Sequence, residues 1–156
     1  MYLIKEEKPL IWSCYKDNSD IIRLLIEKGA DVNVSNKKGE TPLIWSCNNN
    51  NSDIVRLLIE KGADVNVSNE SGETPLIWSY YKDNIDIVRL LIEKGADVNV
   101  SNEWGGTPLI LSCKNDNSDI IRLLIEKGAD INVSNKKEKP LLYGHVSVTT
   151  VILSDY

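Results

Sequence analysis

Apolar side chains fall into two short clusters that alternate along the chain at a constant spacing. In one window, Leu43, Ile44 and Cys47 recur at helical spacing, and a nearly continuous apolar run follows at 54–59. Both clusters return when the window is shifted by 33 residues. The Gly-Ala-Asp triplets that close the units stand at 29–31, 62–64, 95–97 and 128–130. A fixed period of this size indicates a stacked array, in which each unit packs only against its neighbours.

Each unit is predicted to contain two short antiparallel helices. In the second unit Thr41 precedes proline, so its hydroxyl can cap a first helix that we expect over 42–49. Asn51 is predicted to cap the second helix, and Gly62 is predicted to end it in the left-handed conformation. A turn then protrudes before the next unit. A single copy cannot bury its apolar face, so stacking must supply the core.

The unit closely resembles the ankyrin repeat. Thr-Pro-Leu is followed by two short helices, the second written Asp-Ile-Val-Arg-Leu-Leu-Ile-Glu-Lys-Gly-Ala-Asp-Val-Asn, and the match covers residues 8–135 almost continuously. The resemblance implies an all-α repeat solenoid of stacked helix-turn-helix units with short β-turn or hairpin tips. We expect one domain over 1–156, with an N-terminal capping repeat at 1–35, internal repeats at 36–68, 69–101 and 102–134, and a truncated C-terminal cap at 135–156.

The chain departs from the ankyrin pattern in the first helix and between the helices. A leucine of the family pattern is replaced by Trp12, Trp45 and Trp78, which we expect to form a stacked ladder in the packed interior. The Gly-His pair between the helices becomes Asp-Asn or Asn-Asn, and its second residue is expected to cap the second helix. These capping residues are Asn18, Asn51, Asn84 and Asn117.

The three cysteines occupy one position of the repeat, where Tyr80 stands in the third unit. They are Cys14, Cys47 and Cys113. Equivalent positions of packed helices lie about 10 Å apart, too far for a disulfide. We therefore expect small buried side chains with free thiols.

Both ends differ from the internal units. Lys8 replaces the capping threonine of the first unit, and Tyr2, Leu3 and Ile4 are expected to cover the open end of the stack. After Pro140 the pattern supports two alternatives for the last segment, a distorted capping helix or an extended strand. Its apolar residues must be covered in either case, or they form a patch for self-association.

Composition and motifs argue against several classes of function. The net charge of −5 disfavours nucleic acid and anionic membranes as partners. Apolar runs are far too short to span a membrane, and the N-terminus lacks signal-peptide features, so we expect a cytoplasmic protein. The sequence contains no phosphate loop or nucleophile elbow, and its one histidine, His145, leaves no catalytic triad or metal cluster. We expect no enzyme activity, cofactor or metal.

Units differ from one another mainly at the turn tips and on the first helices. In the ankyrin family these regions line the concave groove that binds protein partners, and the resemblance carries that role to this chain. The candidate residues on the tips are Lys37, Lys38, Glu40, Glu70, Ser71, Glu73, Glu103 and Trp104; those on the first helices are Tyr15, Lys16, Asn48, Asn49, Tyr81, Lys82, Lys114 and Asn115. Trp104 is the strongest candidate, because exposed aromatic residues dominate binding hot spots.

Two alternatives to a binding scaffold remain. Near-identical units could form a structural or self-associating module, or a natural or engineered fragment of a longer array. The chain could also be a substrate for asparagine hydroxylation, because family-like Val-Asn or Ile-Asn positions recur at Asn33, Asn66, Asn99 and Asn132.

Overall fold

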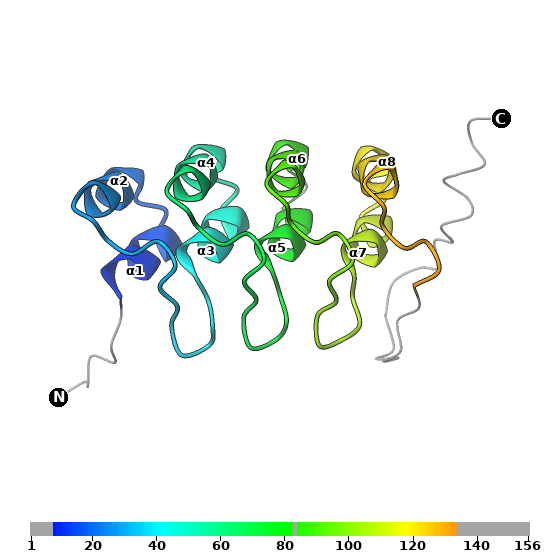
Figure 1. Ribbon diagram of the computed structural model, residues 1–156, viewed down its shortest axis with the longest axis horizontal. Coiled ribbons are helices and arrows are strands. Elements are labelled where there is room, and N and C mark those ends of the chain that lie inside the picture. The colour runs from blue at the N-terminus through cyan, green and yellow to red at the C-terminus, as the bar shows by residue number, and fades with distance from the viewer. Residues whose placement is uncertain (1–7, 83, 134–156) are drawn as a thin grey trace.

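The computed structural model describes residues 8–82 and 84–133, which form eight α-helices and no β-strand. The helices are α1 (Pro9–Tyr15), α2 (Ser19–Glu27), α3 (Pro42–Asn48), α4 (Ser52–Glu60), α5 (Pro75–Tyr81), α6 (Ile85–Glu93), α7 (Pro108–Lys114) and α8 (Ser118–Glu126). Odd-numbered helices form one layer and even-numbered helices the other, with turn tips projecting beyond the first layer (Figure 1). The expected all-α solenoid of stacked helix pairs is confirmed. The predicted N-terminal cover and the C-terminal cap at 135–156 lie outside the described residues.

The first helices begin as the Thr-Pro pattern predicts. Thr41, Thr74 and Thr107 each accept a hydrogen bond from the amide three residues ahead, at 3.3 Å in every case. This satisfies one of the amide groups that a helix leaves unpaired at its start. Lys8 takes the same place before α1, but its side chain caps no amide among the described residues.

The second helices begin at the four predicted asparagine caps. Asn51, for example, accepts from the amide of Ile54 at 3.2 Å. The residue before the cap adopts a left-handed conformation, with φ of 55° at Asp17, 62° at Asn50 and 54° at Asp116. Asp and Asn tolerate this region better than other non-glycine residues, so they substitute here for the family's glycine.

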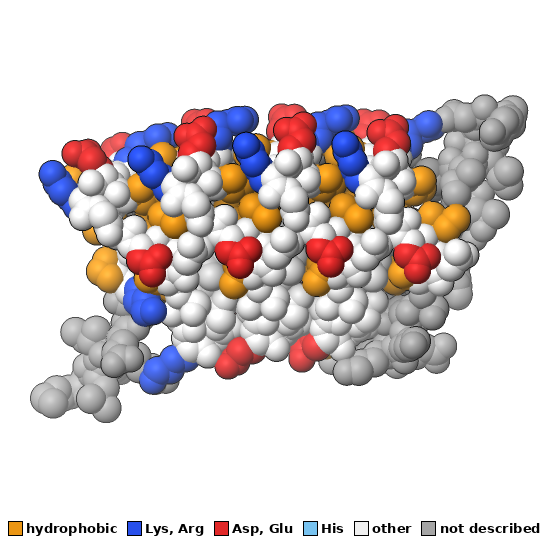
Figure 2. Space-filling model, viewed as in Figure 1, with side chains coloured by type: hydrophobic (Ala, Val, Ile, Leu, Met, Phe, Trp, Pro, Cys, Tyr) orange, Lys and Arg blue, Asp and Glu red, His pale blue; other side chains and the backbone are white. Residues whose placement is uncertain are grey.

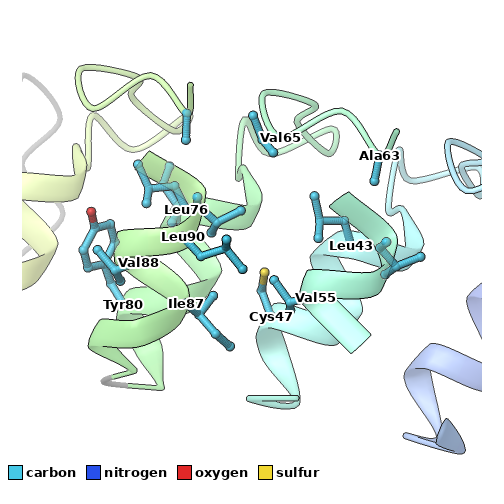
Figure 3. Close-up of a cluster of buried hydrophobic side chains, with 14 of the residues drawn as sticks. Leu43, Cys47, Val55, Ala63, Val65, Leu76, Tyr80, Ile87, Val88 and Leu90 are labelled. Carbon is cyan, nitrogen blue, oxygen red and sulfur yellow. The ribbon is translucent and has the colours of Figure 1, made fainter. Parts of the chain in front are cut away.

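The core is a continuous strip between the two helical layers. Leu43, Leu76 and Val88 are among its buried side chains, and Figure 3 shows how α3 to α6 contribute to it. All three cysteines lie in the described part, and they are buried and free of disulfides, as predicted. Burial raises the pKa of the Cys14 thiol to about 11. Burial raises the pKa of Cys47 as well.

A ladder of asparagine side chains joins each unit to the next. Asn33 donates to the carbonyl of Gly62 at 2.9 Å and accepts from the amide of Asp64 at 2.8 Å. Asn66 and Asn99 repeat both bonds one and two units further along. Three of the candidate hydroxylation positions therefore hold neighbouring units together.

Candidate functional site

Five aromatic side chains on α1, α3 and α5 form a continuous line across three units, here called the aromatic row. Its members are Trp12, Tyr15, Trp45, Trp78 and Tyr81. Successive ring centroids lie 5.2, 4.9, 6.5 and 5.7 Å apart, so each ring contacts the next. Such distances are typical of favourable aromatic pairs.

The aromatic row lies at the boundary between the surface and the packed interior. Trp12 is 46% exposed, while Tyr15 and Tyr81 are each 44% exposed. Trp45 and Trp78 are partly buried and pack against the edge of the core. The predicted ladder of tryptophans is completed by Tyr15, which lies between Trp12 and Trp45. The prediction that the ladder is interior is wrong for Trp12 and holds only in part for Trp45 and Trp78.

Helix geometry explains the exposure. In α3 the side chains of Leu43, Ile44, Ser46 and Cys47 are buried, which leaves Trp45 on the remaining face of the helix. Residues three apart on a helix share a face. The pairs Trp12–Tyr15 and Trp78–Tyr81 have this spacing. Since Tyr15 and Tyr81 were predicted to be at the surface, the same spacing could have predicted that these tryptophans lie beside them.

Lysine side chains lie at two places along the aromatic row. The Lys16 Nζ atom is 5.1 Å from the ring centroid of Trp12 and 5.1 Å from that of Tyr15. Both distances allow a cation–π interaction. Lys82 is exposed at the equivalent position of the third unit, next to Tyr81.

A turn tip borders the aromatic row beside Tyr81. Burial and the nearby carboxylate of Glu73 raise the pKa of the Tyr81 hydroxyl. Glu73 is itself a buried residue, and its carboxylate accepts a hydrogen bond from Asn69 Nδ2 at 3.1 Å. Asn36 makes the equivalent bond to Glu40 at 2.7 Å. Both predicted binding glutamates are therefore hydrogen-bonded within their own turns.

Two predicted binding residues of the first-helix region also form hydrogen bonds to a neighbouring unit. Asn49 Nδ2 donates to the carbonyl of Cys14 at 2.6 Å, and Asn115 Nδ2 donates to the carbonyl of Tyr80 at 2.9 Å. Each bond joins a unit to the one before it. Asn48 is partly buried, whereas Lys114 is exposed at the end of α7.

The tips pair with one another through the backbone. The amide of Glu70 donates to the carbonyl of Lys38 at 2.8 Å, and the amide of Glu103 donates to the carbonyl of Ser71 at 2.9 Å. Gly72 has φ of 73°, and a Cβ there would lie 3.1 Å from the backbone of Asn102. Glycine is therefore required where neighbouring tips approach.

The outer side chains of the tips change charge along the stack. Lys37, Lys38, Glu70 and Glu103 are exposed, so basic groups at the first tip give way to acidic groups at the next two. Along the lower edge of Figure 2, blue side chains are followed by red ones. Trp104 stands at the last of these tips and is 38% exposed.

The described residues contain no group of three or more side chains that could hold a metal ion. Within the same residues, no helix is long and apolar enough to cross a membrane.

Comparison with known families agrees with this architecture. A family model described as ankyrin repeats (3 copies) matches residues 3–69 and 62–135. No curated protein matches the chain. The capped helix pairs, the glycine-containing tips and the asparagine ladder all lie within the matched residues, and the chain belongs to the ankyrin-repeat family.

Proposed function

We propose that this protein is a binding scaffold that holds a protein partner against the aromatic row and the neighbouring tips. Ankyrin repeats are generally protein–protein interaction modules and are typically non-catalytic. The observation that carries the proposal is the aromatic row itself, in which each of five rings contacts the next and three are nearly half exposed.

The chemistry of the aromatic row suits a binding surface. Large aromatic side chains supply much contact area, and Trp and Tyr are enriched among residues that dominate binding energy. The rings are held by short helices in a stack, so little side-chain freedom is lost when a partner docks. Tyr15, Lys16, Tyr81 and Lys82 keep their predicted role in this proposal, and Trp12, Trp45 and Trp78 join them.

The exposed residues of the tips take rim positions in this proposal. The exposed charges at Lys37, Lys38, Glu70 and Glu103 would select partners by charge pattern. Trp104 would add a second aromatic contact at the last tip. Four other predicted residues would contribute indirectly, by holding the shape of the tips and helix ends, because their polar groups already have hydrogen-bond partners. They are Glu40, Glu73, Asn49 and Asn115.

A capture experiment tests the proposal. The immobilised chain would be compared with a Trp12→Ala/Tyr81→Ala variant and with an Arg56→Ala/Arg89→Ala control, which changes exposed residues on α4 and α6 instead. All three proteins should show the same thermal midpoint before use. We expect a protein that is retained by the parent chain and the control and lost from the row variant. Equal retention by all three would place binding elsewhere.

A second candidate function, end-to-end self-association, rests on a different observation. Ile21 and Leu24 on α2 are 45% and 52% exposed, whereas Ile54 and Ile87, equivalent to Ile21, are 0% and 1% exposed. At the other end, Ile131 is 50% exposed, although the equivalent Val32 is buried. Light scattering over a concentration series would test this candidate. Assembly that weakens in Leu24→Lys would support it, and a constant monomer mass would exclude it.

A further inference from the structure

One polar side chain of the last tip lacks the hydrogen bond that its equivalents form. Asn69 donates through Nδ2 to the carboxylate of Glu73 at 3.1 Å, and the second unit contains the same bond. The equivalent residue of the fourth unit is Asn102, but Gly106 stands where the glutamate would be. Within the described residues, Asn102 Nδ2 donates to no acceptor. The fourth unit therefore keeps the donor and lacks the carboxylate.

The side chain of Asn102 is held in the same orientation as its equivalents. Its Oδ1 atom accepts from the amides of Trp104 and Gly106 at 3.1 and 2.8 Å. Asn69 Oδ1 accepts from the two equivalent amides of its own tip at 3.0 and 2.9 Å. Since two bonds fix the oxygen in both tips, the NH₂ group of Asn102 is directed as that of Asn69 is.

The unpaired NH₂ group can be reached by a ligand. The described part of the chain has two fully enclosed side-chain polar atoms without a partner, Trp78 Nε1 and the Tyr80 hydroxyl oxygen. Asn102 Nδ2 is not one of them, so it keeps some accessible surface although the residue as a whole is only 6% exposed. The tip therefore holds a donor that is oriented, unpaired and accessible.

We propose that the last tip binds the carboxylate of a glutamate side chain of the protein partner; the inference rests on the proposed function. The incoming carboxylate would accept from Asn102 Nδ2, as the carboxylate of Glu73 accepts from Asn69. A charged acceptor makes a stronger hydrogen bond to an amide than a neutral one does. Leaving a nearly buried donor unpaired is unfavourable, so the free tip gains when a partner supplies the acceptor.

A lysine adds attraction that the third unit lacks. In the third unit, burial and the nearby carboxylate of Glu73 raise the pKa of the Tyr81 hydroxyl. Lys114 occupies the position of Tyr81 in the fourth unit, is exposed, and forms no ion pair with any described residue. Its ammonium group can therefore approach a carboxylate at Asn102. Asp116 is exposed two residues later and lowers the local positive charge, so the hydrogen bond carries the specificity and the lysine adds to it.

The acidic residue on the same tip is compatible with a bound carboxylate. Glu103 is exposed beside the proposed site. Glu70 occupies the equivalent position of the third unit, and there the carboxylate of Glu73 still bonds to Asn69. The arrangement of the third unit is therefore a precedent within the chain for the proposed complex.

Trp104 extends the site beyond the carboxylate. Its amide donates to Asn102 Oδ1, so it lies on the same turn, and its side chain is 38% exposed. Exposed indole rings supply a large apolar contact area. We therefore expect apolar residues next to the glutamate of the partner.

Nuclear magnetic resonance of the full chain tests the site directly, because each asparagine NH₂ group gives its own signals. The probe is acetyl-Leu-Glu-Leu-amide. One comparison peptide replaces Glu with Gln, and another, acetyl-Leu-Gln-Leu, carries its charge at a free C-terminal carboxylate. We expect the probe to shift the NH₂ signals of Asn102 until they saturate and to leave those of Asn69, which are already bonded, in place. Both comparison peptides should bind at least about fivefold more weakly.

Gly106→Glu rebuilds the arrangement of the third unit and should block the site. Gly106 does not adopt the left-handed conformation of Gly105, so a side chain is compatible with its backbone. A Cβ there would lie 3.1 Å from Asn102 Oδ1 and 3.4 Å from Leu111 Cδ2, which are both side-chain atoms. We expect the probe to bind at least about tenfold more weakly to Gly106→Glu, with no loss of thermal stability. Gly106→Ala, which adds the Cβ without the carboxylate, should stay within about twofold of the parent chain.

A second pair of variants tests the lysine. Lys114→Gln should weaken binding of the probe about threefold at low salt and less at high salt, because salt screens the attraction. Lys127→Gln, which removes an exposed charge at the end of α8, is the matched control and should leave binding unchanged.

The possible failures are distinguishable. If the Gln peptide shifts the Asn102 signals as strongly as the probe, or if Gly106→Glu binds the probe as well as the parent chain does, the inference is overturned. Tighter binding of the peptide with the free C-terminal carboxylate overturns the assignment to a side chain. If the probe does not bind but capture of a partner still depends on Trp12 and Tyr81, the inference is overturned and the proposed function stands. If the probe binds at Asn102 while capture ignores the row variants, the site stands and the proposed function fails.

Discussion

At the scale of single residues, Tyr80 is the side chain that fits its surroundings least well. It occupies the position of the three cysteines and is 1% exposed, with a hydroxyl that has no hydrogen-bond partner among the described residues. Burial raises its pKa well above the usual range. A buried polar group without a partner costs about 1–3 kcal/mol.

We expect Tyr80→Phe to stabilise the protein by about 1 kcal/mol, because it removes the unpaired hydroxyl and keeps the ring. Urea denaturation would measure the change in the free energy of unfolding, provided that the dependence of this free energy on urea concentration is the same in both proteins. Tyr81→Phe is the matched control, since that side chain is 44% exposed, and it should change stability little. A loss of stability in Tyr80→Phe would mean that the hydroxyl has a partner, such as a buried water.

The burial of the cysteines was predicted from the sequence, but the unpaired hydroxyl of Tyr80 was not. Cys14, Cys47 and Cys113 are small and apolar, so periodicity alone placed them in the core. Whether a buried hydroxyl finds an acceptor depends on the atoms that neighbouring units bring around it, and no local pattern encodes those.

At the scale of helices, the starts follow local chemistry closely. Thr41 caps α3, and Lys8 is the one first-helix start in the described region without a side-chain cap. The end of α3 is less well predicted, because the helix stops at Asn48 and not at 49. Asn49 instead serves as its C-cap and donates to the previous unit, which is a tertiary contact.

This difference between the first two units predicts opposite effects of two substitutions. Lys8→Thr should stabilise the protein by about 0.5–1 kcal/mol, because the new hydroxyl can accept from the amide of Ile11. Thr41→Ala should destabilise it by about 1 kcal/mol through loss of the existing cap. Thermal unfolding would measure both, and an unchanged midpoint in Lys8→Thr would contradict the capping argument for α1.

At the scale of the whole molecule, stability depends on how strongly neighbouring units are joined. The asparagine ladder supplies two hydrogen bonds at each junction from Asn33, Asn66 or Asn99. In a linear array such nearest-neighbour contacts hold the units together, because distant units never touch.

We expect Asn66→Ala to lower the free energy of unfolding by about 1–2 kcal/mol, since it removes both bonds of the central junction. Asn66→Asp should also destabilise the protein, because the carboxylate still accepts from Asp97 but faces the carbonyl of Gly95. Glu60→Ala, at an exposed position of α4, is the control. Urea denaturation would give all three values, and an Asn66→Ala protein as stable as the control would show that the ladder contributes little.

By itself, the sequence determined the repeat, its helix pairs and the starts of those helices. These features follow from apolar periodicity and capping chemistry within a few residues, and they recur in every unit. It also identified Tyr15, Tyr81 and their lysines as variable surface positions. The placement of the tryptophans was decided only by the tertiary structure. Their exposure depends on which helix face remains after the second helices and the neighbouring units have packed, and that is a property of the assembled stack.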